Sequence, residues 1–193
     1  MNTNIKRESQ EYGFGRYFIL TALLSFVGWA WEVLVMRVQT GKFYNQGFMT
    51  LPFCPIYGCS LLVAYLVLGT PDHGRGILKG VKTKSTRYAL YFAFAFIIPT
   101  IAELLVGAVL DRGLHLTLWS YSSLPMNYKG YVCLPISLVW SGLIFLFMKF
   151  VFPYLYRFIR RIPKGLAGAI AFSLCFIFLI DFSLNVAFLI YRQ

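Results

Sequence analysis

Three carboxylates lie inside long apolar stretches of the sequence: Glu32, Glu103 and Asp181. A charged carboxylate near the centre of a bilayer costs about 2.5–3.5 kcal/mol even on lenient insertion scales. A bound cation, a retained proton or hydrogen bonds from neighbouring helices must offset that cost. The sequence therefore predicts either an intramembrane site for a cationic or protonatable ligand, or carboxylates that structural hydrogen bonds satisfy.

Small and aromatic residues border the first two carboxylates. Gly28 lies four residues and Trp29 three residues before Glu32, so both border its helix face. Glycine lets another backbone come close in a membrane. Pro99 lies four residues before Glu103, where it removes a backbone donor and frees a carbonyl. These surroundings favour a ligand site at Glu32 and Glu103.

A Cys-Pro pair opens the next apolar stretch. Pro55 suits the first turn of a helix, because its missing N–H would have no partner there. Cys54 would lie at the positive end of that helix, which makes it a candidate nucleophile or soft ligand. The alternative is a small buried residue at a tight helix entry. A disulfide between Cys54 and Cys133 is also open, since it depends on the distance between them.

Polar and aromatic side chains gather before and after these helices. Their hydroxyls, amides and rings suit a polar or amine ligand, to which a ring contributes about 0.5–2 kcal/mol of cation–π attraction. The candidate ligand-binding residues are Glu32, Glu103, Trp29, Asn45, Cys54, Tyr57, Trp119, Tyr121, Ser122 and Asn127.

Five apolar stretches must position these residues. They are 17–36, 51–69, 88–110, 131–154 and 166–190, and each is long enough to cross a bilayer core of about 30 Å as a helix. They lack the alternation of a membrane β-barrel. The predicted fold is therefore an all-α, polytopic bundle of five transmembrane helices, formed as a single domain by residues 1–193.

The composition agrees with a membrane protein. Hydrophobic residues make up 59% of the chain and charged residues 13%, too few for the surface of a soluble domain of this size. The net charge of +11 comes mainly from short segments between the apolar stretches, where it sets topology and meets anionic lipid. We expect membrane lipids as partners and no nucleic acid.

The basic segments also predict an orientation. They are 6–16, 75–87 and 157–164, whereas 37–50 and 111–130 carry few basic residues. Basic loops stay in the cytoplasm. We therefore expect a multi-pass protein of the plasma or inner membrane, with its N-terminus cytoplasmic and its C-terminus extracytoplasmic. The outward loops would fold over the bundle with aromatics at the interface.

A faint repeat relates the first two hairpins, which would be parallel repeats formed by spans one and two and by spans three and four. The order is a glutamate in an outward helix, then an asparagine, then a cysteine entering the returning helix. The members are Glu32, Asn45 and Cys54 in the first hairpin and Glu103, Asn127 and Cys133 in the second. If the repeat is real, both sets converge on one outer pocket.

Several motifs are missing from the sequence. No G-x(4)-G-K-[ST] phosphate loop occurs, so the chain is no ATPase by itself. No H-E-x-x-H, G-x-S-x-G or paired-histidine metal motif occurs either. We expect neither a metal nor a cofactor.

The segments 25–32, 41–48, 52–58, 119–122 and 125–127 resemble, in this order, the ABC-transporter type IV (CmpB-like) membrane protein family. The residues that carry the resemblance include Gly28, Trp29, Glu32, Phe43, Asn45, Gly47, Pro52, Cys54, Pro55, Trp119, Tyr121, Pro125 and Asn127. The resemblance covers about residues 18–142 and implies a small bacterial multi-span protein of the permease type. An ATPase would then be another chain, and a partner membrane subunit or a homo-oligomer is open.

The sequence departs from the family pattern at two positions that would be charged. Gln46 stands where the family has arginine, and Ser120 stands where it has aspartate. We hypothesise that relatives form an ion pair across the two outer loops, which a neutral contact between Gln46 and Ser120 replaces here.

Three functions fit these observations. The first is a transport-type protein that binds a small polar, cationic or protonatable ligand at an outward-facing acidic site. The second is a membrane enzyme acting on a lipid or lipid-linked substrate, with Glu32 or Glu103 as general base and Tyr121 or Cys54 assisting. The third is an assembly or sensor subunit whose polar core is structural.

Overall fold

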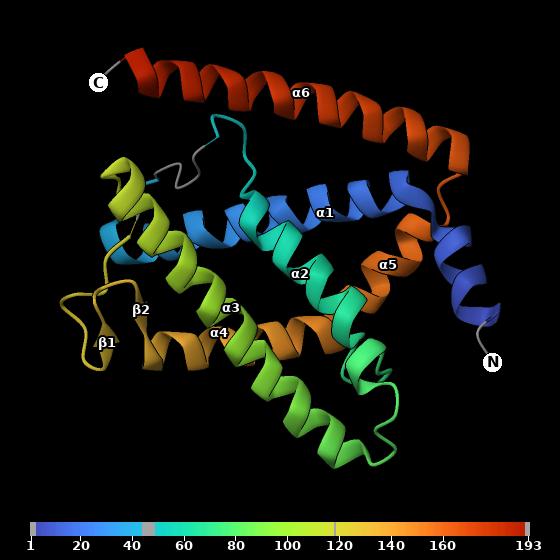
Figure 1. The fold of residues 1–193 in the computed structure, drawn as a ribbon. Helices are drawn as coiled ribbons and strands as arrows, with labels where there is room; N and C mark the ends of the chain where they lie inside the picture. Colours follow the sequence, from blue (N-terminus) through green and yellow to red (C-terminus); the bar gives the residue numbers. More distant parts are fainter. Residues whose placement is uncertain (1–2, 44–48, 118, 192–193) are drawn as a thin grey trace. The chain divides into compact units, whose positions relative to one another are not determined.

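The computed structural model describes residues 3–43, 49–117 and 119–191, with no statement on the side chains of residues 3–12, 39, 114, 189 and 190. Figure 1 shows a chain of helices with one short hairpin. The elements are α1 (Thr3–Thr40), α2 (Pro55–Leu68), η1 (Gly76–Leu78), α3 (Lys84–Leu114), β1 (Asn127–Tyr128), β2 (Val132–Cys133), α4 (Leu134–Leu146), η2 (Phe147–Val151), α5 (Phe152–Arg160) and α6 (Lys164–Tyr191).

Among the described residues, four helices are long and apolar enough to cross a membrane: Gly13–Val38, Lys84–Gly113, Leu134–Arg160 and Lys164–Phe188. The prediction of an all-α, multi-pass membrane protein is confirmed by these helices. The second expected span, 51–69, is the helix Pro55–Leu68 of 14 residues, about 21 Å long at 1.5 Å per residue. A fifth crossing and the hairpin repeat therefore stay predictions.

Local sequence sets where the helices bend, begin and end. Gly13 has φ +68°, so α1 changes direction there at a residue without a Cβ. At the end of α3, His115 is left-handed and the N–H of Leu116 donates to the carbonyl of Leu110, which closes the last turn. Pro135 lies in the first turn of α4, where a missing N–H costs nothing.

The chain divides into two compact units, of which the first is Met1–Val63 with Tyr154–Gln193. Within it, α1 packs along α6. A Cβ on Gly15 would lie 2.8 Å from the carbonyl oxygen of Ala167, so the two backbones are as close as glycine allows. A Cβ on Gly58 would lie 2.3 Å from the carbonyl oxygen of Thr21, which brings the start of α2 equally close to α1.

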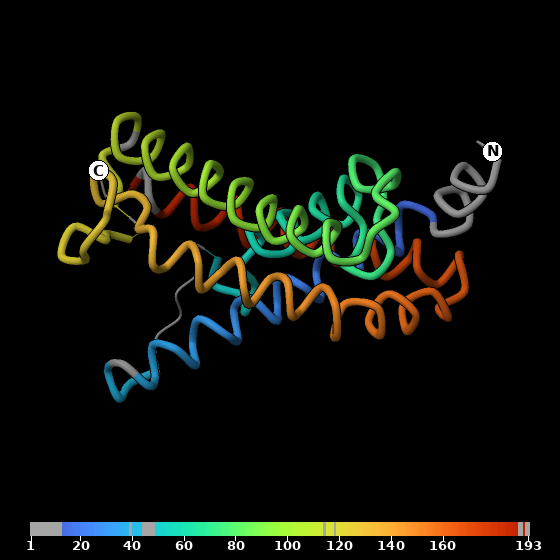
Figure 2. The backbone as a smooth tube through the Cα atoms, turned by 90° about the horizontal axis from the view of Figure 1, so that it is seen from below, coloured from blue at the N-terminus to red at the C-terminus, as the bar shows by residue number. Residues whose placement is uncertain are grey.

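The second unit is Ala64–Pro153, in which α3 packs along α4. Tyr91 is fully buried and meets Phe145 edge-on, with ring centroids 6.0 Å apart. Within this unit, α4 continues directly into η2, as the orange tube in Figure 2 shows. Lys149, in η2, lies over the rings of Tyr88 and Phe150 at 4.6 and 5.0 Å, which offsets part of the cost of a cation inside an apolar helix.

Candidate functional site

Glu32 lies on α1 in the first unit and is held by the start of α2. The hydroxyl of Tyr57 donates a hydrogen bond of 2.7 Å to Oε1 of Glu32. The same tyrosine covers Gly28, where an added Cβ would lie only 2.5 Å from the Tyr57 Cβ and Cγ atoms. The glycine thus admits the ring, and the ring brings its hydroxyl to the carboxyl one helical turn further along α1.

Cys54 and Trp29 are the other predicted site residues of the first unit. The backbone N–H of Cys54 donates to the carbonyl of Ser25 at 3.1 Å, which fixes the entry to α2 against α1. The Cys54 thiol is close enough to Glu32 for a direct electrostatic interaction. The ring of Trp29 stacks on Phe26 with centroids 5.9 Å apart. Carboxyl, phenol and thiol therefore gather where α1 meets α2.

Glu103 lies on α3 in the second unit and has a phenol of its own. The segment after α3 folds back along the helix, and the hydroxyl of Tyr121 donates to Oε1 of Glu103 at 2.9 Å. Both Glu103 and Tyr121 are half-buried. Two of the predicted site residues are thus in direct contact in each unit: Tyr57 with Glu32, and Tyr121 with Glu103.

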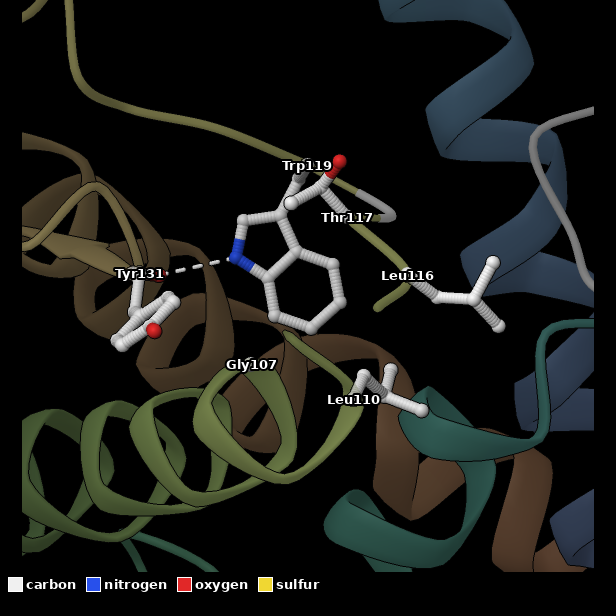
Figure 3. Close-up of a pocket in the computed structure, with 6 residues that line it drawn as sticks. All are labelled: Gly107, Leu110, Leu116, Thr117, Trp119 and Tyr131. Carbon is white, nitrogen blue, oxygen red and sulfur yellow. Dashed lines mark hydrogen bonds between the residues drawn. The ribbon is translucent and has the colours of Figure 1, made fainter. Parts of the chain in front are cut away.

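Trp119 holds this returning segment in place. Its indole N–H donates to the carbonyl oxygen of Tyr131 at 2.9 Å (Figure 3). The two residues, with Gly107, Leu110, Leu116 and Thr117, line a small cavity of about 10 Å³, which is room for roughly one water molecule. The indole therefore fixes the fold of the loop, and the cavity beside it is too small for an organic ligand.

Asn127 also builds the loop. Its side-chain amide donates to the carbonyl of Leu124 at 2.7 Å, and its oxygen accepts the N–H of Gly130 at 3.1 Å. Ser122 is exposed, and its hydroxyl pairs with that of Ser120 at 3.0 Å. The structure places the polar atoms of Asn127 on the loop's own backbone, whereas the Ser122 hydroxyl pairs with another serine of the loop.

A further carboxyl–phenol pair was not identified from the sequence. The hydroxyl of Tyr131 donates to Oδ2 of Asp111 at 2.5 Å, and the Tyr131 ring lies on Gly107, where an added Cβ would be 3.3 Å away. Gly107 precedes Asp111 by four residues, as Gly28 precedes Glu32. That shared spacing is the signal that could have revealed it. The hydroxyl of Tyr88 likewise donates to Asp72, in the segment between α2 and α3.

Asp181 has a different environment, on α6 in the first unit. Its Oδ2 accepts the backbone N–H groups of Thr50 and Leu51 at 3.1 and 3.5 Å. The neighbouring Asn185 exchanges a side-chain hydrogen bond with Thr50 at 3.1 Å. Asp181 thus ties the segment before α2 to α6, as expected of a carboxylate satisfied by loop donors.

Charged partners are scarce around these carboxyls. Asp72 pairs with Lys84 at 3.9 Å. Glu32 and Glu103 accept phenol hydrogen bonds, and no basic side chain that the structure describes forms an ion pair with either of them. In residues 3–43, 49–117 and 119–191, no three His, Cys, Asp or Glu side chains are close enough together to hold a metal ion.

The predicted site residues fall into two groups, one in each unit. Glu32, Trp29, Cys54 and Tyr57 belong to the first, and Glu103, Trp119, Tyr121, Ser122 and Asn127 belong to the second. Asn45 and Gln46 lie outside the described residues. The four cysteines, Cys54, Cys59, Cys133 and Cys175, are free thiols.

Comparison with known proteins gives the family. No curated protein and no solved structure matches the chain significantly. A family model, described as putative ABC-transporter type IV, matches residues 17–186. That range contains nearly all of the four candidate spans. It also contains the Glu32–Tyr57 and Glu103–Tyr121 pairs. The chain is therefore a multi-pass, transport-type membrane protein that belongs to the putative ABC-transporter type IV family.

Proposed function

We propose that this protein is a permease-like transporter that binds a small cationic or protonatable ligand at an outward-facing acidic site inside the membrane. The observation that carries the proposal is the environment of the Glu32 and Glu103 carboxyls. Each lies in a candidate span, each accepts a hydrogen bond from a tyrosine, and neither forms an ion pair with a described basic side chain.

The physical argument rests on what a phenol does for a carboxylate. A hydrogen bond to a charged group contributes about 1.5–3 kcal/mol, but it leaves the charge itself in place. A carboxylate inside a span therefore still favours a positive partner. A ligand ammonium group or a coupling proton would supply that positive charge in this protein.

The surrounding side chains would then shape the ligand's environment. Tyr57 and Tyr121 lie next to the carboxyls through their hydroxyls. Trp29 would add a further ring face, which suits a cation. Trp119 and Asn127 would position the loop that carries Tyr121, since their polar atoms bind loop backbone. Ser122 and Asn45 would complete the site from the two outer loops.

The proposal includes an arrangement of the whole chain. The two units would form one membrane domain, and α2 with the residues before it would make a fifth crossing. The hairpins α1–α2 and α3–α4 would then be parallel repeats that bring both carboxyl–phenol groups to the outer side. The N-terminus would be cytoplasmic, and the C-terminus extracytoplasmic.

Energy for transport would come from another chain or from a coupling proton. The sequence has no phosphate-binding loop, so a permease of this kind needs a separate ATPase or a coupling proton. A partner membrane subunit or a second copy of the chain would complete the pathway.

A membrane enzyme acting on a lipid or lipid-linked substrate is the second candidate, and the electrostatic interaction between the Cys54 thiol and the Glu32 carboxyl favours it. Glu32 would act as general base for the thiol, and Tyr57 would orient the carboxyl. This reaction would change the substrate covalently, whereas transport would release it unchanged.

Native mass spectrometry of the purified chain with a panel of small amines and quaternary ammonium ions tests the proposal. We compare wild type with Glu32→Gln and Glu103→Gln, using Asp72→Asn as the matched control, because Asp72 also accepts a phenol hydrogen bond but lies outside the candidate spans. Wild type and the control should bind one species that both glutamine variants lose. Equal binding by all four proteins would contradict the site, and a chemically altered species would indicate the enzyme.

A further inference from the structure

The end of α5 carries a hollow that the proposed transport site does not use. Its volume is about 370 Å³, and it is lined by Tyr154, Arg157, Phe158 and Arg161. These residues follow the spacing of one helix face. Ile159, which lies between them in the sequence but off that face, is 1% exposed and packs inward. The hollow is thus formed by the outer face of a helix whose inner face is anchored.

The backbone around the hollow is held by several hydrogen bonds. The guanidinium of Arg16 donates through Nε and Nη2 to the carbonyl of Ile162, at 3.0 and 2.7 Å. The N–H groups of Arg161 and Ile162 donate back to Phe158 and Ile159, both at 3.1 Å. This turn between α5 and α6 therefore presents the Arg157 and Arg161 side chains from a fixed backbone.

The lining combines positive charge with aromatic surface. The guanidinium of Arg157 lies over the ring of Tyr154, 4.8 Å from its centroid. Arg160 and Lys164 add two more positive charges to the same segment of the sequence. This arrangement suits an anion that also has an apolar part.

The position of the hollow along the helix indicates at which level of the membrane it lies. The candidate span Leu134–Arg160 ends at this place, so the two arginines lie at the end of a membrane crossing. Lipid phosphates lie at that level, and basic pockets between such helix ends suit anionic headgroups. The rings of Tyr154 and Phe158 are 68% and 64% exposed and lie on the same helix face as the arginines.

We propose that this hollow binds the headgroup of an anionic phospholipid. The guanidinium groups of Arg157 and Arg161 donate to the phosphate oxygens, as planar donor groups do in other phosphate sites. Tyr154 and Phe158 contact the glycerol and the first acyl carbons. A free phosphate would use the arginines alone, so the exposed rings favour a lipid as the source of the phosphate.

Lipid titration of the full chain in detergent, followed by native mass spectrometry, tests this site. The probes are phosphatidylglycerol, phosphatidylcholine and inorganic phosphate. Wild type should bind phosphatidylglycerol at least about tenfold more tightly than phosphatidylcholine, because only the former has a net negative charge. Equal affinity for the two lipids would overturn the proposal, as would inorganic phosphate displacing the lipid at equal concentration.

Two double variants test whether lipid binding needs the arginines that line the hollow or only the positive charge of the turn. Arg157→Gln with Arg161→Gln should weaken phosphatidylglycerol binding about tenfold or more. The matched control, Arg160→Gln with Lys164→Gln, removes the same charge from the same segment of the sequence and should change affinity by less than about threefold. Equal losses in both would overturn a specific site. If the first pair does not fold, Arg161→Gln alone should still weaken binding about threefold.

The aromatic side of the hollow has its own test. Tyr154→Ala with Phe158→Ala should weaken phosphatidylglycerol binding about fivefold and leave inorganic phosphate binding unchanged, because the rings contact only the apolar part of the lipid. The control is Phe172→Ala with Phe176→Ala, two exposed rings on α6, which should leave both affinities unchanged. An unchanged lipid affinity in the first pair would overturn the role of the rings.

Discussion

Tyr57 donates its hydroxyl to Glu32 while its ring lies on Gly28, one turn before that carboxyl. In the second unit, Tyr131 makes the same arrangement with Asp111 and Gly107. In both cases a glycine four residues before an acid admits a tyrosine from the following segment. A change from glycine to alanine adds a single methyl group at this position and therefore tests the arrangement.

Gly28→Ala should destabilise the protein by about 1–3 kcal/mol, because its Cβ would overlap the Tyr57 side chain at 2.5 Å. Gly107→Ala should cost less, since its nearest Tyr131 atom is 3.3 Å away. Thermal unfolding in one detergent measures both.

The control for these two changes is Gly142→Ala, at a helical position with no heavy atom within 4 Å. It should stabilise the protein by about 0.5–1 kcal/mol through helix propensity. If Gly28→Ala behaves like Gly142→Ala, the close contact between Tyr57 and α1 does not exist.

Tyr121 and Glu103 should be energetically coupled. Removing the phenol hydroxyl in Tyr121→Phe leaves the Glu103 carboxyl without its donor, which should cost about 1–3 kcal/mol. Once Glu103 is changed to alanine, Tyr121→Phe should cost much less. A double-mutant cycle on unfolding free energies should therefore give a coupling of about 0.5–3 kcal/mol. Simple additivity would show that the hydrogen bond contributes nothing.

Asp181 should matter for stability and not for the ligand. Asp181→Ala removes the acceptor of the Thr50 and Leu51 N–H groups and should cost about 1–3 kcal/mol. Asp181→Asn keeps an acceptor oxygen and should cost less. Binding of the ligand found with wild type, measured on the folded fraction, should be unchanged in Asp181→Asn. Loss of binding in that variant would make Asp181 part of the site.

The long helices could be predicted from the sequence because a span needs only a run of apolar residues. The start of α2 was harder to predict. Residues 51–54 are apolar but include Pro52 and lead to Pro55, and a helix begins most easily at a proline. The helix thus starts at Pro55, although the apolar stretch begins earlier.

The candidate site, too, could be predicted only in part from the sequence. The in-span position of Glu32 and Glu103 identified them, because an intramembrane carboxylate is costly wherever its partners lie. Asp111 was assigned to a loop, since it comes at the end of the apolar stretch. Its contact with Tyr131 depends on how the chain returns along α3, which residue spacing does not specify. The loop role of Asn127 depends on the same return path.

The Asp111 contact predicts a pH effect at Tyr131, which precedes α4 and lies outside the candidate spans. The hydrogen bond to the Asp111 carboxyl raises the pKa of Tyr131 above its ordinary value near 10. The folded state thus favours the protonated phenol, so this contact stabilises the fold below about pH 10 and is lost as the pH rises further.

Tyrosinate absorbance measures this titration as the difference between wild type and Tyr131→Phe. The difference signal should rise at higher pH than that of an ordinary tyrosine. In an Asp111→Asn background it should return toward pH 10. An unchanged curve in that background would show that Asp111 does not set the Tyr131 titration.

The two termini should lie on opposite sides of the membrane if α2 completes a fifth crossing. The four long helices alone would return the chain to the side where it started. The basic residues in 75–87 and 157–164 favour a cytoplasmic position for both segments. If the N-terminus is also cytoplasmic, α1 carries the chain outward, so α2 must cross back to bring residues 75–87 into the cytoplasm. A fluorescent protein fused at the N-terminus should therefore be bright. Alkaline phosphatase fused at the C-terminus should be active, because it matures only outside the cytoplasm. Inactive phosphatase at the C-terminus, with a bright fluorescent fusion there instead, would mean that α2 does not cross.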